Sequence, residues 1–164
     1  MVEARIIGTL AEILPTSHSW MKDMEVIGEG IGIDLIDPEK RCNSRQIGDK
    51  GEDVAALFLE RMGIEVLERN WRCSFGEVDI IARDGETIIL LEVKTRITTK
   101  RNDEIAPELA VGSRKRAKYQ KLALIYLAKA PQYDSVRFDV AAVKLIDKDT
   151  ARIRYLAGAF EWDY

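Results

Sequence analysis

The chain has 164 residues, of which 46% are hydrophobic and 32% are charged, and this composition is typical of one globular domain with a sizeable core. No run of about 18 apolar residues occurs, so the sequence predicts no transmembrane helix. The net charge of −3 is uneven: residues 94–121 hold nine basic and three acidic side chains, a surplus of six that leaves −9 for the rest. This distribution excludes a histone-like binder and predicts one local phosphate-binding face.

The cysteine and histidine content narrows the chemistry further. Cys42 and Cys73 are far apart in the sequence, and His18 is the only histidine. This content is typical of a reduced, cytoplasmic protein, and it disfavours His-rich zinc sites and nucleophiles that depend on a histidine base. We also expect no signal peptide, because the N-terminal segment lacks a basic stretch followed by a long apolar one.

The first 45 residues differ in pattern from the rest, so we expect an N-terminal extension over 1–45 and a folded domain over 46–164. An apolar stretch predicts a short helix near 3–14, which Pro15 ends, and alternating residues predict a strand within 26–36. We expect this extension to pack on the domain or on a neighbouring molecule.

In the domain, Val54, Phe58 and Met62 recur at helical spacing and predict a helix over 48–63. A hairpin signal, Asp84-Gly85, joins two later strands, and Ser113 is the expected N-cap of a second helix. The expected strands span 64–71, 76–83, 86–96, 135–146 and 151–156, and the second helix spans 113–130. This order predicts an α/β fold with a central mixed sheet flanked by helices.

A two-residue turn at Asp84-Gly85 would separate charged from apolar side chains on the hairpin. This register pairs residue 81 with 88, 79 with 90 and 77 with 92, so Glu77 lies opposite Glu92. One face then carries Glu77, Asp79, Ile81, Ile88, Leu90, Glu92 and Lys94, and the other carries Val78, Ile80, Ala82, Ile89, Leu91 and Val93. Three carboxylates and a lysine therefore gather at one end of an otherwise apolar face.

Carboxylates that face one another across a sheet destabilise it unless a positive charge lies between them. Lys94 supplies one such charge, and a divalent cation is the other candidate. Because all the donor atoms are hard oxygens, we expect Mg²⁺ or Mn²⁺ rather than zinc. The alternative is a solvated strand edge on which acids and lysine merely pair.

Basic side chains also gather at the start of the second predicted helix, where cations oppose the helix dipole. Together with free backbone N–H groups, they can hold a phosphate backbone. Tyr119 and Gln120 follow and could reach a sugar or a base, although a tyrosine at this spacing is more typical of a core. The alternative is a solvated basic face. The candidate nucleic-acid-binding residues are Arg96, Arg114, Lys115, Arg116 and Lys118.

An ordered set of motifs resembles the YraN-like predicted endonucleases, a family similar to archaeal Holliday-junction resolvases within the PD-(D/E)xK nuclease superfamily. The motifs are Gly-Glu at 51–52, ERNWR at 68–72, GEVDIIA at 76–82, LEVKTR at 91–96 and RFDVAAV at 137–143. The resemblance covers about residues 45–160. It implies a restriction-endonuclease-like αβββαβ core and a metal-dependent phosphodiesterase site.

The resemblance also implies roles for individual residues. Lys115 matches a basic position of the second helix, although Gly112-Ser113 departs from the Thr-Pro-like start of that helix in the family. Judged without the resemblance, Glu52 would be a first-turn acid that favours the helix dipole. The implied catalytic residues are Glu52, Asp79, Glu92 and Lys94, and the implied metal ligands are Asp79, Glu92, Glu77 and the main-chain carbonyl of Val93.

The expected function is therefore Mg²⁺- or Mn²⁺-dependent hydrolysis of phosphodiester bonds in DNA, with RNA as an open alternative and no membrane partner. By analogy with the resolvases, branched or structured DNA is the expected substrate and a homodimer the expected assembly. Two other classes remain open. One is a non-catalytic nucleic-acid-binding module with a nuclease-like fold, and the other is a protein-interaction domain whose basic stretch binds an acidic partner.

Overall fold

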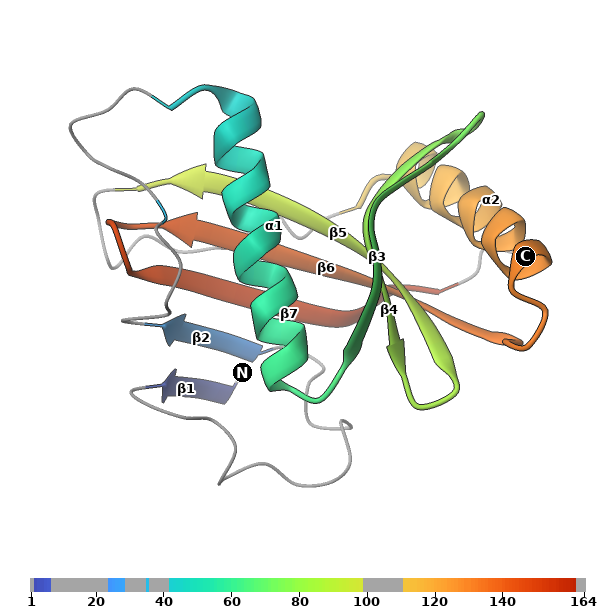
Figure 1. Ribbon diagram of the computed structural model, residues 1–164, viewed down its shortest axis with the longest axis horizontal. Helices are drawn as coiled ribbons and strands as arrows, with labels where there is room; N and C mark the ends of the chain where they lie inside the picture. Colours follow the sequence, from blue (N-terminus) through green and yellow to red (C-terminus); the bar gives the residue numbers. More distant parts are fainter. Residues whose placement is uncertain (1, 7–23, 29–34, 36–41, 99–110, 162–164) are drawn as a thin grey trace.

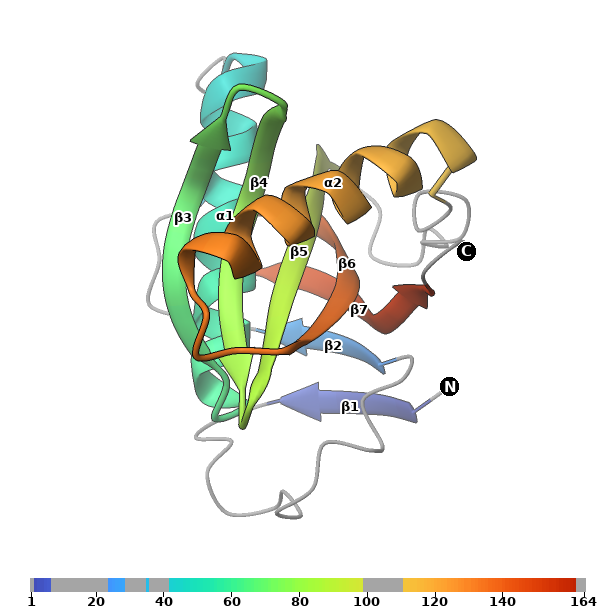
Figure 2. The ribbon, with the colours of Figure 1, turned by 90° about the vertical axis from the view of Figure 1, so that its right-hand side faces the viewer.

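A mixed seven-stranded sheet carries helix α1 on one face and helix α2 on the other (Figures 1 and 2). The computed structural model describes residues 2–6, 24–28, 35, 42–98 and 111–161. The strands lie in the order β1-β2-β7-β6-β5-β4-β3, with β5 parallel to β6 and antiparallel to β4. The elements are β1 (Val2–Ile6), β2 (Met24–Gly28), α1 (Ser44–Arg61), β3 (Glu65–Cys73), β4 (Gly76–Asp84), β5 (Thr87–Ile97), α2 (Ser113–Lys129), β6 (Ser135–Leu145) and β7 (Ala151–Phe160).

The run from α1 to β6 confirms the predicted α/β class and the αβββαβ order of the core. The last predicted strand is also present, and as β7 it pairs antiparallel with β6. Within the described ranges, no helix is long and apolar enough to cross a membrane.

The N-terminal segment differs from expectation. Residues 2–6, which were predicted to begin a helix, form β1 and pair parallel with β2, and β2 pairs antiparallel with β7. The open edge of the sheet offers backbone donors and acceptors to this segment. A prediction from the local sequence alone does not take such distant partners into account. The strand predicted within 26–36 ends at Gly28. Apart from Leu35, the rest of that stretch lies outside the described residues, as does 7–14.

The start of each helix is set by its cap. Helix α1 begins four residues earlier than predicted because Asn43 and Gln46 form a capping box, in which each backbone N–H donates to the other side chain at 2.9 Å. Helix α2 begins at Ser113, but Gly112 is its N-cap and makes no side-chain capping bond. The prediction that Ser113 caps the helix is therefore wrong.

The turn between β4 and β5 shifts the predicted register by two residues. Asp84 pairs with Thr87 and Ile80 pairs with Leu91, so the turn is Gly85-Glu86 rather than Asp84-Gly85. Gly85 has a φ of 60° at the first turn position, the conformation that a type II′ turn assigns to glycine. Because the shift is even, it preserves the faces of β5, but it removes the predicted opposition of Glu77 and Glu92.

Two apolar clusters fill the space between the sheet and its helices. Ile80, Leu91 and α1 belong to one cluster, and Ile81, Leu90 and α2 belong to the other, as the predicted alternation requires. Val78 is the exception, because it packs with Trp71 on the α2 side. The β3–β4 pairing is irregular: its register shifts between Val66 and Glu68, and Asn70, between the paired residues Arg69 and Trp71, has a φ of 52°.

Candidate active site

The site lies where β4 and β5 separate. Their backbone pairing runs from the turn to Ile80 and Leu91, and beyond that pair the two strands diverge (Figure 2). At the next step a side chain takes the place of the backbone hydrogen bonds between the two strands. Asp79 Oδ2 accepts a hydrogen bond from the backbone N–H of Val93 at 2.7 Å. A partly buried backbone donor that would lose its strand partner is thereby satisfied, and a carboxylate is fixed beside Glu92.

Helix α2 fixes the second carboxylate. Lys115 Nζ and the hydroxyl of Tyr119 both donate to Glu92, whose side chain is 16% exposed. The two donors stand four residues apart on one helix and therefore lie on the same helix face. Burial, and then the charge of Glu92, raises the pKa of the Tyr119 hydroxyl, so Tyr119 stays a proton donor to Glu92.

The charge of Glu92 affects the ionisation of Asp79. Burial, and then the nearby charges of Glu92 and Glu52, raise the pKa of Asp79 to about 7, against the lowering effects of the Val93 N–H and Lys115. Asp79 is thus a carboxylate whose charge is poorly compensated near neutral pH. A bound cation would favour its ionised form.

Glu52 approaches the same place from α1. The preceding residue, Gly51, lies so close to β5 that an added Cβ would stand 1.7 Å from Thr95 Oγ1. Asn70 Nδ2 donates to Glu52 Oε2 at 2.8 Å, and burial raises the pKa of Glu52. Because α1 begins at Ser44, Glu52 lies far beyond the first turn, and the helix-dipole explanation for this acid is wrong.

Lys94 and Glu77 are the two remaining residues of the predicted charged cluster. Lys94 follows Glu92 by two residues on a strand that pairs with β6 without a bulge, so it lies on the same face of β5. Glu77 pairs across the hairpin with Arg72, at 3.2 Å between Oε2 and Nε, and its side chain is 55% exposed. The structure therefore brings Asp79, Glu92 and Glu52 together, whereas Glu77 forms an ion pair with Arg72.

The donor set suits a hard cation. No three His, Cys, Asp or Glu side chains among the described residues form a ready-made metal cage. Mg²⁺, however, commonly takes only one or two carboxylates from the protein and completes its shell with water and phosphate oxygens. Asp79 and Glu92 provide two such carboxylates. The raised pKa of Asp79 means that a cation bound there would stabilise its ionised form.

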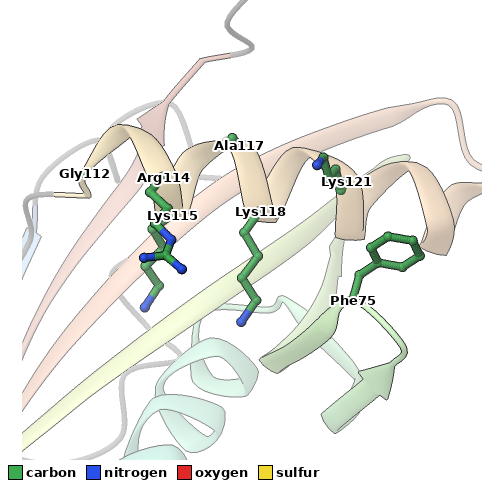
Figure 3. Close-up of a pocket in the computed structure, with 7 residues that line it drawn as sticks. All are labelled: Phe75, Gly112, Arg114, Lys115, Ala117, Lys118 and Lys121. Carbon is green, nitrogen blue, oxygen red and sulfur yellow. The ribbon is translucent and has the colours of Figure 1, made fainter.

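A cationic groove opens between α2 and the β3–β4 turn. Figure 3 shows Arg114, Lys115 and Lys118 extending from one side of α2, and Phe75 beside the part of the helix that carries Lys121. Three of the five predicted nucleic-acid-binding residues line it, whereas Arg96 and Arg116 are absent from its lining and have a buried Nε. The groove has a volume of about 780 Å³ and is lined by Phe75, Gly112, Arg114, Lys115, Ala117, Lys118 and Lys121.

The sequence analysis missed or misplaced several of these residues. Tyr119, for which a core position was the alternative to contact with a sugar or base, is only 2% exposed, and its hydrogen bond to Glu92 was not predicted. The four-residue spacing of Lys115 and Tyr119 is the signal that could have linked them. Phe75 was not predicted and Lys121 was expected only within the basic stretch, because nothing local indicates that a turn residue and a mid-helix lysine line one groove.

Comparison with known proteins gives a family but no activity. A model of the uncharacterised protein family UPF0102 matches residues 51–143. The UPF0102 protein GSU0650 of Geobacter sulfurreducens is 42% identical over 123 residues, which cover 74% of this chain and 94% of that protein. A UPF0102 protein of Syntrophus aciditrophicus is 47% identical over 120 residues, or 71% and 90% of the two chains. The UPF0102 protein Francci3_3586 of Frankia casuarinae is 44% identical over 115 residues, or 70% and 95%.

Proposed function

We propose that this chain, which belongs to the uncharacterised protein family UPF0102, is a metal-dependent nuclease that hydrolyses phosphodiester bonds in DNA. The family name itself assigns no activity. The observation that supports the proposal best is the pair of carboxylates at the point where β4 and β5 separate. One of them has a raised pKa, and both lie near a groove lined by cations. The resemblance of the sequence motifs to PD-(D/E)xK nucleases agrees with this proposal.

In this proposal Asp79, Glu92 and the main-chain carbonyl of Val93 would hold Mg²⁺ or Mn²⁺, and Glu52 or Glu77 would hold its outer water shell. When bound, the cation supplies Lewis-acid chemistry that acidifies water and polarises a phosphoryl oxygen. Lys115 and Tyr119 orient Glu92 from α2 through their hydrogen bonds.

Lys94 is the proposed active-site lysine. It lies on the same strand face as Glu92, two residues further along β5. An ammonium at this position can orient the attacking water or stabilise the charge that develops on the phosphate. The cations of the groove hold the nucleic-acid backbone, so binding is expected to weaken steeply with salt. The sequence motifs include no clear reader of base edges, and branched or structured DNA is the proposed substrate.

A cleavage assay tests the proposal. End-labelled duplex, single-stranded, flapped and four-way DNA, and RNA, are incubated with the wild type in Mg²⁺ or Mn²⁺ and in EDTA. We expect a metal-dependent product on at least one substrate and a loss of about 100-fold or more in Asp79→Ala. Asp134→Ala, a change in an exposed turn residue, is the matched control and should cleave normally. If no substrate yields a metal-dependent product, the nuclease proposal fails.

A non-catalytic nucleic-acid-binding module is the second candidate. The ion pair between Lys115 and Glu92 favours it, because this lysine already compensates one of the two carboxylates. In that case the protein should bind DNA in EDTA and in Mg²⁺ with the same affinity, and the Asp79→Ala variant should bind like the wild type.

A further inference from the structure

We infer that the cationic groove binds an unpaired segment of a nucleic-acid strand and that Phe75 stacks on one of its bases. The inference rests on the proposed function, since it names the substrate class that the site would take. It assigns a role to an aromatic residue that the nuclease chemistry does not use.

Phe75 is an exposed aromatic ring at a fixed place. It lies in the β3–β4 turn, its side chain is 61% exposed, and its backbone N–H donates to Cys73 Sγ at 3.4 Å. Figure 3 shows the ring beside the part of α2 that carries Lys121. Because removing apolar surface from water is favourable, a partner that covers this exposed ring would gain binding free energy from the hydrophobic effect.

The groove next to the ring carries only positive charge. All four of its charged lining residues are cations, and three of them, Arg114, Lys118 and Lys121, make no ion pair with another described residue. From residue 114 to 121 the helix rises about 10 Å, so these cations are spread along the groove rather than gathered at one point. Uncompensated cations beside an aromatic ring are the features with which proteins hold single strands.

Lys118 links this groove to the site. Its side chain crosses the turn so closely that a Cβ on Gly76 would stand 2.3 Å from Lys118 Cε, and Gly76 has a φ of 144°. Lys118 also lines a second, smaller hollow with Arg72 and Glu77. At the other end of the groove, Lys115 contacts Glu92. A strand that follows these lysines would therefore run from the Phe75 ring to the proposed catalytic carboxylates.

The ring selects for unpaired bases. In a duplex the faces of the bases are covered by their neighbours, and a side chain can stack only after it has unstacked a base. Single strands, flaps and junction branch points present base faces without that cost. The inference therefore predicts that Phe75 contributes to the binding of unpaired DNA or RNA and contributes little to the binding of an uninterrupted duplex.

A fluorescence titration tests the inference. A 12-nucleotide DNA strand with 2-aminopurine at its centre, the matching RNA strand and the matching DNA duplex are titrated in EDTA with wild type, Phe75→Ala, Phe75→Leu and Phe75→Trp. We expect wild type and Phe75→Trp to quench 2-aminopurine in a single strand. Phe75→Ala and Phe75→Leu should bind that strand about 5- to 100-fold more weakly and lose the quenching, while duplex affinity should change less than twofold.

Phe75→Leu keeps an apolar side chain in the turn, so a change in that variant reports the ring rather than folding. Ile97→Ala is the matched control, because Ile97 is 42% exposed and lies on the opposite face of the sheet, and it should behave as wild type. Quenching on DNA, RNA or both supports the inference, and the tighter complex identifies the polymer. Equal affinity and quenching in wild type and Phe75→Leu would overturn it.

The titration contains no divalent metal, so its outcome is independent of catalysis. Quenching without cleavage would overturn the nuclease proposal and leave this inference in place. Metal-dependent cleavage combined with an unchanged Phe75→Leu titration would overturn this inference alone.

Discussion

At the residue scale, Asp79 combines a structural and a chemical role. Its carboxylate accepts the hydrogen bond from Val93 that joins β4 to β5 after their pairing has ended. The same carboxylate lies beside Glu92 and Glu52, and burial together with these charges raises its pKa. The surroundings of Asp79 thus disfavour its ionised form. Strongly shifted pKa values of this kind cluster at functional sites.

This raised pKa predicts how stability depends on pH. The folded protein binds the Asp79 proton up to a pH of about 7, whereas the unfolded chain releases it near 3.8, so ionisation of Asp79 lowers the free energy of unfolding as the pH rises through this window. Without metal, Asp79→Asn should be more stable than wild type at pH 8, by about 1–3 kcal/mol, and should lose this advantage near pH 4. Chemical denaturation at both pH values measures the difference. A variant that is less stable than wild type at pH 8 would contradict the assigned pKa shift.

At the scale of elements, the approach of α1 to β5 decides whether Glu52 reaches the site. Gly51 allows this approach, whereas Gly48 on the same helix has open space where its side chain would be. Gly51→Ala should therefore destabilise the protein by about 1–3 kcal/mol, because its Cβ would overlap Thr95. Gly48→Ala should stabilise it by about 0.5–1 kcal/mol through helix propensity. Thermal unfolding of the two variants makes a matched pair, and the explanation fails if both shift the midpoint in the same direction.

The elements also indicate how far the sequence could predict the site. The faces of β5 followed from residue alternation, so the positions of Glu92 and Lys94 on one face could be predicted. The register with β4 could not, because Asp84-Gly85 and Gly85-Glu86 are both plausible turns and only the turn geometry distinguishes them. Val78 was placed on the wrong face because strict alternation was assumed along β4, whereas its pairing with β3 is irregular.

At the scale of the whole molecule, a buried polar network joins strands that are distant in sequence. Asp139, whose side chain is fully buried, accepts hydrogen bonds from Arg137, from the Tyr155 hydroxyl and from the backbone N–H of Gly158. Arg137 also pairs with Asp84 at the β4–β5 turn. The motif at 137–143 entered the sequence analysis only as part of a family resemblance. Its structural role could not be predicted, because the partners come from three separate strands.

Removal of Asp139 should therefore affect the entire fold. Asp139→Ala removes the buried acceptor of three donors and leaves the partly buried Arg137 with less compensation, so it should cost about 3–5 kcal/mol of the free energy of unfolding. Asp134→Ala, in the exposed turn just before β6, should change stability by less than about 0.5 kcal/mol. Urea denaturation compares the two variants. Nearly equal midpoints would show that the network does not stabilise the molecule.

The central claim is that the carboxylates of Asp79 and Glu92 together hold a divalent cation. Calorimetric titration of Mn²⁺ into the wild type, the double variant Asp79→Asn/Glu92→Gln and the control Glu65→Gln, whose acid pairs with Arg83 on the surface, tests it most directly. We predict a saturable site in the wild type and in the control and the loss of that site in the double variant. Equal Mn²⁺ binding by all three proteins, or no binding by the wild type, would contradict the claim.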